Sequence, residues 1–381
     1  MKPSNRNYYF DYTSTTPMDE TIANIYFDIL KKYYANSEST YKLGLEVHDL
    51  VETSRRKIAG LLSVLPEEVI FTSGASETNS FALKGYALKN KHKGRHIITS
   101  KMEHSSILGA CKQLEEEFDF QITYLSVPKD GIIPLEHIKK HIRNDTIMVS
   151  LMALNNEVGS IQNISKIAMF LKTLPRICFF CDGVQIVGKH DFDLSNIDLF
   201  SFTTHKFYGV KGCGILIKKK NIELLPLIHG GQQEQGIRGG TINAPACIVA
   251  AKTLRMALET QESHLEQVYV LYKKLRDALA LIHEIEINSP ENASPYILNF
   301  SCSTMNSEIM MNALNERNIF VSSQSACSSR TKRPSPTLLA MNYEEKRAIS
   351  AIRVSLSHHT TTEELDYLIK NIKEIIYEYS T

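Results

Sequence analysis

Ser201-Phe202-Thr203-Thr204-His205-Lys206 is the stretch that most constrains the fold and the chemistry of this 381-residue chain. It predicts a strand that ends by presenting Lys206 beside His205 and small hydroxyl residues. A lysine amine in a partly desolvated pocket has a lowered pKa and can condense with a carbonyl cofactor, while neighbouring hydroxyl groups can hold a phosphate. A lysine at a strand end is more often simply solvated, so the chemical interpretation depends on the rest of the chain.

Strand-like and helical segments alternate on both sides of this stretch. The alternation predicts an α/β fold with a mostly parallel sheet between layers of helices. The expected strands are 95–100, 122–127, 146–152, 178–182, 199–204 and 214–218, and the helical patterns between them include 105–117 and 164–174.

A second, smaller unit is expected from the last third of the chain. Leucines at helical spacing beyond Ala246, through Leu275 and Leu281, predict long core-facing helical structure that links two domains. Strands are expected near 297–301, 319–322 and 353–357. We therefore predict a large domain of residues 14–255 and a small α+β domain of residues 1–13 and 256–381.

Cys178-Phe179-Phe180-Cys181-Asp182 predicts a buried strand that ends in a carboxylate. Open α/β sheets bind ligands at the carboxyl ends of their strands. Pyridoxal phosphate needs an anion against its pyridinium nitrogen, which makes Asp182 the candidate, although an aspartate here could simply cap the following turn. The two cysteines lie three residues apart, so in a strand they face opposite sides and no metal site is expected.

Phe71-Thr72-Ser73-Gly74-Ala75-Ser76-Glu77-Thr78-Asn79 leads into a helical pattern at 80–87. Small residues at a helix start leave backbone N–H groups free, and the helix dipole favours a phosphate there. The same residues could instead be an N-cap with a capping-box glutamate.

Val321-Ser322-Ser323-Gln324-Ser325-Ala326-Cys327-Ser328-Ser329 predicts a strand that opens into a polar loop carrying one cysteine. A thiol on such a loop can ionise and reach a substrate, and the cations Arg330, Lys332 and Arg333 would favour the thiolate. The alternative is a buried cysteine that acts as a small apolar side chain.

The overall composition bears on binding to nucleic acids and membranes and on the expected cellular compartment. With 43 basic and 42 acidic residues the chain is nearly neutral, which gives no case for direct nucleic-acid or membrane-surface binding. Neither a signal-peptide pattern nor an apolar run of spanning length is apparent. The seven scattered cysteines suit a reducing compartment, so a cytoplasmic protein is expected.

Several spaced motifs in one order carry a family resemblance over nearly the whole chain. Besides the stretches quoted above they are 9–17, 99–104, 155–159, 229–231, 238–241 and 352–356. The chain resembles cysteine desulfurases of the NifS/IscS type, in the class V aminotransferase group of pyridoxal phosphate enzymes. The resemblance implies fold type I, with a mostly parallel central sheet in the large domain and the Cys327 loop in the smaller α+β domain.

The resemblance also implies roles around pyridoxal 5'-phosphate. Lys206 would hold the cofactor as a Schiff base and act as the base, Asp182 would pair with the ring nitrogen, and His104 would stack on the ring and shuttle the thiol proton. Arg353, helped by Asn156, would bind the substrate carboxylate. The implied cofactor-binding set is Ala75, Ser76, His104, Asn156, Asp182, Gln185, Thr203, His205 and Lys206, with Thr241 contributed by the second subunit of a homodimer.

The implied reaction converts L-cysteine to L-alanine and leaves the sulfur on Cys327 as a persulfide. An acceptor protein, either an iron–sulfur scaffold or an enzyme of thio-cofactor or tRNA thiolation, would take it. Two other classes stay open. Another class V enzyme, such as a selenocysteine lyase, a β-lyase or an aminotransferase, would not need Cys327. A non-catalytic sulfur-transfer scaffold would not need a desolvated Lys206.

Overall fold

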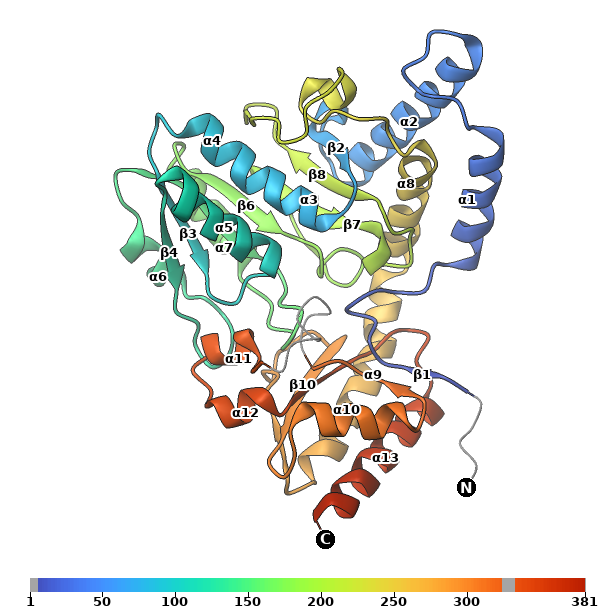
Figure 1. Ribbon diagram of the computed structural model, residues 1–381, viewed down its shortest axis with the longest axis vertical. Helices are drawn as coiled ribbons and strands as arrows, with labels where there is room; N and C mark the ends of the chain where they lie inside the picture. The colour runs from blue at the N-terminus through green and yellow to red at the C-terminus, as the bar shows by residue number, and fades with distance from the viewer. Residues whose placement is uncertain (1–5, 324–332, 381) are drawn as a thin grey trace.

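The computed structural model describes residues 6–323 and 333–380, in three sheets and their covering helices (Figure 1). The main sheet has seven strands in the order β2-β8-β7-β6-β5-β3-β4. Strand β8 is antiparallel to both of its neighbours, and the other pairs are parallel, so the predicted mostly parallel sheet is confirmed. Its strands are β2 (Val69–Thr72), β3 (His96–Ser100), β4 (Gln121–Leu125), β5 (Thr146–Met152), β6 (Cys178–Asp182), β7 (Leu199–Thr203) and β8 (Gly214–Lys218).

Alternate residues of these strands enter two separate cores. In β6, Cys178 and Phe180 pack into one apolar cluster, whereas Phe179 and Cys181 pack into the other. Both cysteines are buried. The expectation that they face opposite sides of the sheet is therefore confirmed, and each acts as a small apolar side chain.

One face of the sheet is covered by the helical segment from α3 (Ala75–Ser80) to α4 (Tyr86–Asn90), together with α5 (Ser105–Phe118) (Figure 1). A π-helical turn, Phe81–Gly85, joins α3 to α4 without a break. The helix thus begins at Ala75, inside the small-residue stretch and earlier than the pattern predicted. The other face packs against α2 (Lys42–Leu61), α7 (Ile164–Lys172) and α8 (Ala244–Glu259).

The predicted long helical segment after Ala246 is two helices. Helix α8 ends at Glu259, and α9 (Gln261–Ala280) begins after Thr260, whose backbone N–H still donates to the Met256 carbonyl. Together they run from the main sheet to the smaller, C-terminal part of the chain (Figure 1).

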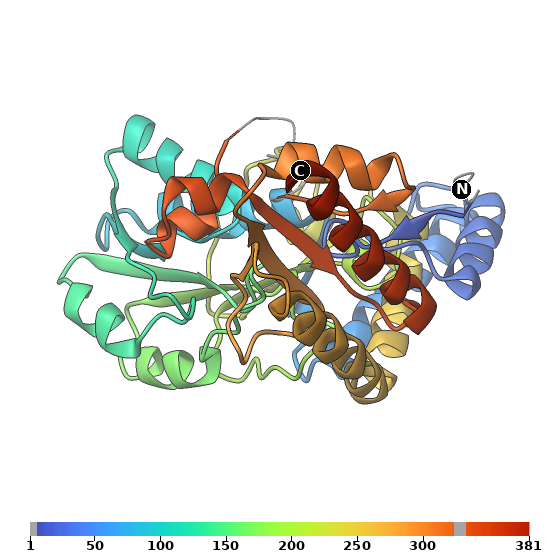
Figure 2. The same ribbon diagram turned by 90° about the horizontal axis from the view of Figure 1, so that it is seen from below.

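That smaller part holds an antiparallel sheet of β9 (Ile285–Ile287), β10 (Ile297–Cys302) and β12 (Ala351–Ser355). Strand β1 (Tyr8–Tyr9) pairs in parallel with β11 (Ile319–Phe320), which brings the N-terminal segment beside the C-terminal elements. Helix α10 (Ser307–Asn315) packs against both β12 and α13 (Thr362–Ser380), on the side seen in Figure 2. The remaining helices are α1 (Glu20–Lys32), α6 (Leu135–His141), α11 (Pro336–Ala340) and α12 (Glu345–Ile349).

The residue boundaries of the two predicted domains stay a prediction. Among the described residues, no helix combines the length and the apolar character needed to cross a membrane.

Candidate active site

A cavity of about 470 Å³ opens at the carboxyl edge of the main sheet. Ligand sites of open α/β sheets form at this edge, because loops and helix starts converge there. Of the residues predicted to form the site, it brings together Ala75, Ser76, His104, Asn156, Asp182, Gln185, His205, Lys206 and Arg353.

Lys206 ends the short 3-10 turn Thr204–Lys206 that follows β7. Its Nζ donates hydrogen bonds to the backbone carbonyls of Thr13, at 2.8 Å, and Ser14, at 2.7 Å. The side chain is therefore held at the cavity wall by the N-terminal segment, which is far away in the sequence. An amine at this place is available to a carbonyl compound that enters the cavity.

Asp182 is the last residue of β6, and its buried carboxylate lines the cavity. The Val184 N–H donates to one oxygen at 2.9 Å, and the Asn79 amide donates to the other at 2.8 Å. Burial raises the pKa of Asp182, while these two hydrogen bonds act in the opposite direction. A cationic ring nitrogen placed against this carboxylate would favour its ionised form further.

His104 is the N-cap of α5, which fixes the orientation of its ring. Its Nδ1 accepts from the Ser106 N–H at 3.2 Å and lies 2.8 Å from the Ser106 hydroxyl. Burial lowers the pKa of His104, so the ring is a neutral imidazole near pH 7. Because Nδ1 is occupied as an acceptor, Nε2 carries the proton and is left to face a ligand.

One end of the cavity is suited to an anion. The helix that starts at Ala75 has no side-chain cap at Gly74, so its first N–H groups stay available to a ligand. Burial and the neighbouring cations lower the pKa of His205 to about 4, which keeps that ring neutral. Glu77 accepts from the N–H of Ser73, the residue before the N-cap Gly74, at 2.8 Å, and from Arg238 at 2.8 Å, so it does not form the capping box that was the alternative.

Arg353 lies in the middle of β12 and is almost fully buried, at 1% exposed. One terminal nitrogen donates to the Asn156 carbonyl at 2.8 Å, and the other donates to Asp11 at 2.7 Å and Ser14 at 2.8 Å. Its Nε has no partner among the described residues. The guanidinium is therefore anchored beside the N-terminal segment that also holds Lys206.

Both the nitrogen and the oxygen of the Gln185 side-chain amide are hydrogen-bonded. Its Nε2 donates to the Thr13 carbonyl at 3.2 Å, and its Oε1 accepts from the Lys189 ammonium at 2.9 Å. The orientation of the amide is thus fixed by a cation, with the donor end on the side of Thr13.

Three predicted residues are not part of this cavity. Thr203 is buried, and its hydroxyl donates to the Cys213 carbonyl at 2.7 Å instead of lining the site. Thr241 is exposed and does not line the cavity. Thr241 was expected to reach the site of the other subunit in a homodimer, not the site of its own chain. Cys327 lies outside the described residues.

Other residues at the site received no role from the sequence. Thr13 and Ser14 accept from Lys206 through backbone carbonyls, which every residue type possesses, and Ser14 also accepts from Arg353 through its hydroxyl. Asn79 lies one helical turn after Ala75 and bridges Asp182 to the Ser106 and Ser201 hydroxyls. The one sequence signal that pointed to Asn79 was its position one helical turn after Ala75. Lys211, at the cavity mouth, adds a positive charge at the anion end.

The set of groups fits pyridoxal phosphate. An amine, a hydrogen-bonded carboxylate, an anion-binding helix start and a neutral imidazole line one cavity, and these match the aldehyde, ring nitrogen, phosphate and ring face of that cofactor. Among the described residues, no group of three or more His, Cys, Asp and Glu side chains is arranged to hold a metal ion.

Comparison with known proteins agrees with this geometry. The family model described as aminotransferase class-V matches residues 8–368. A NifS/IcsS protein homolog of Lactobacillus delbrueckii subsp. bulgaricus is 38% identical over 98% of this chain and 98% of its own length. Cysteine desulfurase IscS of Salmonella typhi is 38% identical over 97% of this chain and 92% of its own length.

A solved NifS-like protein superposes with a TM-score of 0.92 at 34% identity, covering 98% of this chain and all of that one. The chain belongs to the class V aminotransferase family, among its cysteine desulfurases of the NifS/IscS type.

Proposed function

We propose that this chain is a homodimeric, pyridoxal-phosphate-dependent enzyme that converts L-cysteine to L-alanine and passes the sulfur through Cys327 to an acceptor protein. The observation that carries the proposal is the meeting of the Lys206 amine, the Asp182 carboxylate and the Arg353 guanidinium at one cavity. These groups are the ones needed to hold a carbonyl cofactor, its ring nitrogen and an amino-acid carboxylate.

Bound pyridoxal phosphate would supply an electron sink for the substrate Cα. Asp182 would hold the ring nitrogen, with Asn79 and Val184 keeping both carboxylate oxygens in place. Ala75 and Ser76 at the helix start, with the neutral His205, would donate hydrogen bonds to the phosphate. Thr241 of a second subunit is proposed to complete this end.

Arg353 would bind the substrate carboxylate, helped by Asn156. Its buried Nε lacks an acceptor among the described residues, and a carboxylate oxygen is an acceptor of the right charge. Lys206 would then take the Cα proton, and His104 would exchange the proton of the substrate thiol. A neutral imidazole suits that exchange because Nε2 carries a proton to give toward the ligand and Nδ1 is an acceptor.

The sulfur step falls to Cys327, on the sequence and on family membership. Its thiolate forms an S–S bond with the substrate sulfur as the C–S bond breaks. The electron pair of that bond stays with the carbon fragment, which takes up a proton and leaves as alanine. Cys327 keeps the sulfur as a persulfide, for an iron–sulfur scaffold or a thiolation enzyme of the cytoplasm.

An apolar surface on α1 and the start of α2 supports the proposed homodimer. Large apolar side chains are exposed along it at Phe27, Leu30, Tyr34, Tyr41, Leu43 and Leu45. Clustered apolar exposure of this kind marks a protein–protein interface more often than an open surface.

The test is the release of alanine and sulfide from L-cysteine in the presence of an added thiol. Wild type, Lys206→Ala and Cys327→Ala are compared, with cofactor binding followed by absorbance. We expect equal alanine and sulfide from the wild type and loss of both in each variant. A wild type that binds no pyridoxal phosphate, or that makes no alanine, contradicts the proposal.

A second candidate, a class V lyase that does not use the cysteine loop, is separated by the same experiment. It predicts that Cys327→Ala keeps full activity while Lys206→Ala loses it. Within the described residues nothing favours it over the desulfurase.

A further inference from the structure

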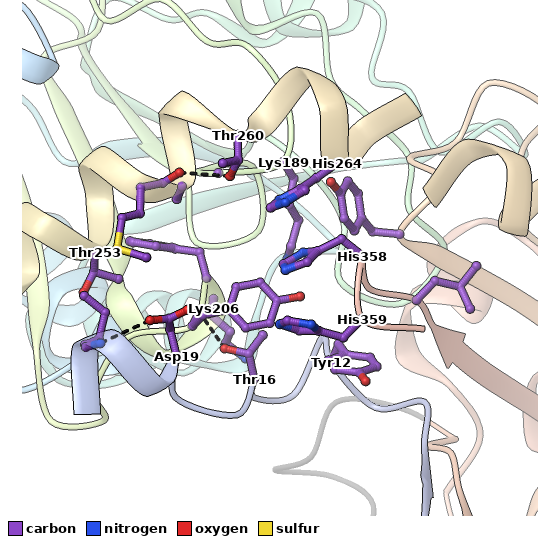
Figure 3. A pocket seen from close by; sticks show the side chains of 18 of the residues that line it. Tyr12, Thr16, Asp19, Lys189, Lys206, Thr253, Thr260, His264, His358 and His359 are labelled. Atoms are coloured by element: carbon purple, nitrogen blue, oxygen red, sulfur yellow. Dashed lines mark hydrogen bonds between the residues drawn. The ribbon is translucent and has the colours of Figure 1, made fainter. Parts of the chain in front are cut away.

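A second cavity, of about 290 Å³, adjoins the cofactor cavity, and Thr13 and Lys206 line both. Its walls come from the start of α1, the junction between α8 and α9, and the residues after β12. Figure 3 shows the side chains of Lys189, His264 and His358 gathered around it. Lys189 also holds the Gln185 amide of the neighbouring cavity, whereas no role proposed above uses His264 or His358.

Lys189 is a buried cation with few partners. It is 8% exposed, and among the described residues its only acceptor is the Gln185 side chain at 2.9 Å. An ammonium group has three protons, so two remain without a protein partner. Burial, with the charges of Lys206 and Arg353, lowers the pKa of Lys189 to about 7, as expected for an amine that lacks an anion.

The carboxylates that line this cavity are occupied elsewhere. Asp19 caps α1 by accepting from the Ile22 N–H at 3.1 Å. Glu259 is exposed and lies 3.8 Å from Arg255. Neither forms an ion pair with Lys189. Among the described residues no carboxylate pairs with Lys189, so an anion that pairs with it in this cavity would come from a ligand.

A second unused donor is the Tyr296 hydroxyl. Tyr296 lines the cavity and is 5% exposed, and its hydroxyl has no hydrogen-bond partner among the described residues. A buried hydroxyl without a partner is costly, and an acceptor that binds there recovers that cost.

The rest of the wall holds one further cationic side chain, Lys206, which donates to the Thr13 and Ser14 carbonyls. The His264 and His358 rings stack at 3.6 Å, and burial lowers the pKa of both, that of His358 to about 3, so they stay neutral. Apolar side chains complete the wall, namely Ile22, Phe207, Met256, Ala257 and Leu356. A phosphate would bring more than one negative charge into this largely apolar cavity, whereas a carboxylate on an apolar body pairs one to one with the Lys189 ammonium and leaves its body against the apolar side chains.

We propose that this cavity binds a small monocarboxylate with a flat apolar body, whose carboxylate pairs with Lys189 and accepts from Tyr296. The site shares Lys206 and the Lys189–Gln185 hydrogen bond with the neighbouring cavity, but its proposed ligand contacts neither the cofactor nor Cys327.

The test is calorimetric titration of the holoenzyme with benzoate, in the presence of saturating L-alanine so that Arg353 is not available to it. We expect a dissociation constant of about 1 mM or below for the wild type. Tyr296→Phe should weaken binding about tenfold and Lys189→Met by more. Tyr86→Phe, which removes a buried hydroxyl far from the cavity, should leave it unchanged, and neutral benzamide should bind less well.

Benzoate binding that survives in both cavity variants overturns the proposal, and so does its absence from the wild type at these concentrations. Binding that L-alanine abolishes assigns the benzoate to the Arg353 site and also overturns it. If Lys189→Met does not fold, Tyr296→Phe decides, because it removes one oxygen atom and keeps the ring. None of these readings depends on turnover, so a failure of the proposed function would be seen separately.

Discussion

Glu103 is a buried carboxyl group that precedes His104 and lies near Asp182. It is 6% exposed, one oxygen accepts from the Ser100 hydroxyl at 2.6 Å, and the other has no partner among the described residues. Burial, aided by the charge of Asp182, raises the pKa of Glu103 to about 8. Glu103 is therefore protonated in the folded protein near pH 7 and ionised in the unfolded chain.

This difference predicts a pH effect on stability. The folded pKa lies above the unfolded value, so the folded state holds more protons between about pH 4.5 and 8, and the contribution of Glu103 is lost as the pH rises through that window. The slope is at most about 1.4 kcal/mol per pH unit. The Glu103→Gln side chain does not ionise. In urea unfolding, the free energy of unfolding of the variant should therefore rise relative to that of the wild type as the pH rises. If the unfolding free energies of the variant and the wild type changed in parallel with pH, the raised pKa of Glu103 would be contradicted.

At this scale the sequence predicted the residues whose side-chain chemistry is distinctive. The roles expected of Lys206, Asp182 and His104 require an amine, a carboxylate and an imidazole. The structure brings these three side chains to one cavity. Thr13 escaped prediction because its contribution is a carbonyl oxygen. Thr203 was expected to bind the phosphate, but its hydroxyl donates to the backbone carbonyl of Cys213 instead.

Among the elements, the contact between the end of β6 and β7 is unusually close. A Cβ atom on Gly183 would lie 1.9 Å from the ring of Phe200. Glycine at this position is therefore paired with a large aromatic side chain on the adjacent strand, and the turn after Asp182 depends on both.

Gly183→Ala should destabilise the fold by about 1 to 3 kcal/mol, the usual cost of overpacking a core. Phe200→Leu frees space, so the double variant should lose less than the sum of the two single variants in urea unfolding. Gly60→Ala in α2, where an added Cβ meets no atom within 4 Å, is the matched control and should be neutral or stabilising. Strict additivity of the two core changes would count against the contact.

Six of the seven strands of the main sheet were predicted to within one or two residues, and all of these except β4 are buried along their whole length. Strand β2 was not predicted. The helix boundaries were less predictable. The break at Thr260 and the early start at Ala75 follow from packing at the domain junction and the cavity edge, which local periodicity does not encode.

On the scale of the whole molecule, the exposed apolar surface of α1 and α2 predicts association. Leu30→Glu, at a side chain 46% exposed, should shift a dimer toward monomers in sedimentation velocity, since a buried unpaired charge at an interface is costly. Leu281→Glu, at an even more exposed leucine away from this surface, is the control and should leave the sedimentation coefficient unchanged. A Leu30→Glu variant that sediments as the wild type does would place the interface elsewhere.

The pairing of β1 with β11, and of Asp11 with Arg353, also bears on synthesis of the protein. Residues near the start of the chain cannot take these partners until the ribosome has made residue 353. At about 5 to 20 residues per second, that is a wait of roughly 20 to 70 s. During this time the nascent chain carries a free N-terminal strand, and the arginine end of the active site does not yet exist. The cavity that holds Lys206 and Arg353 is therefore completed only near the end of translation.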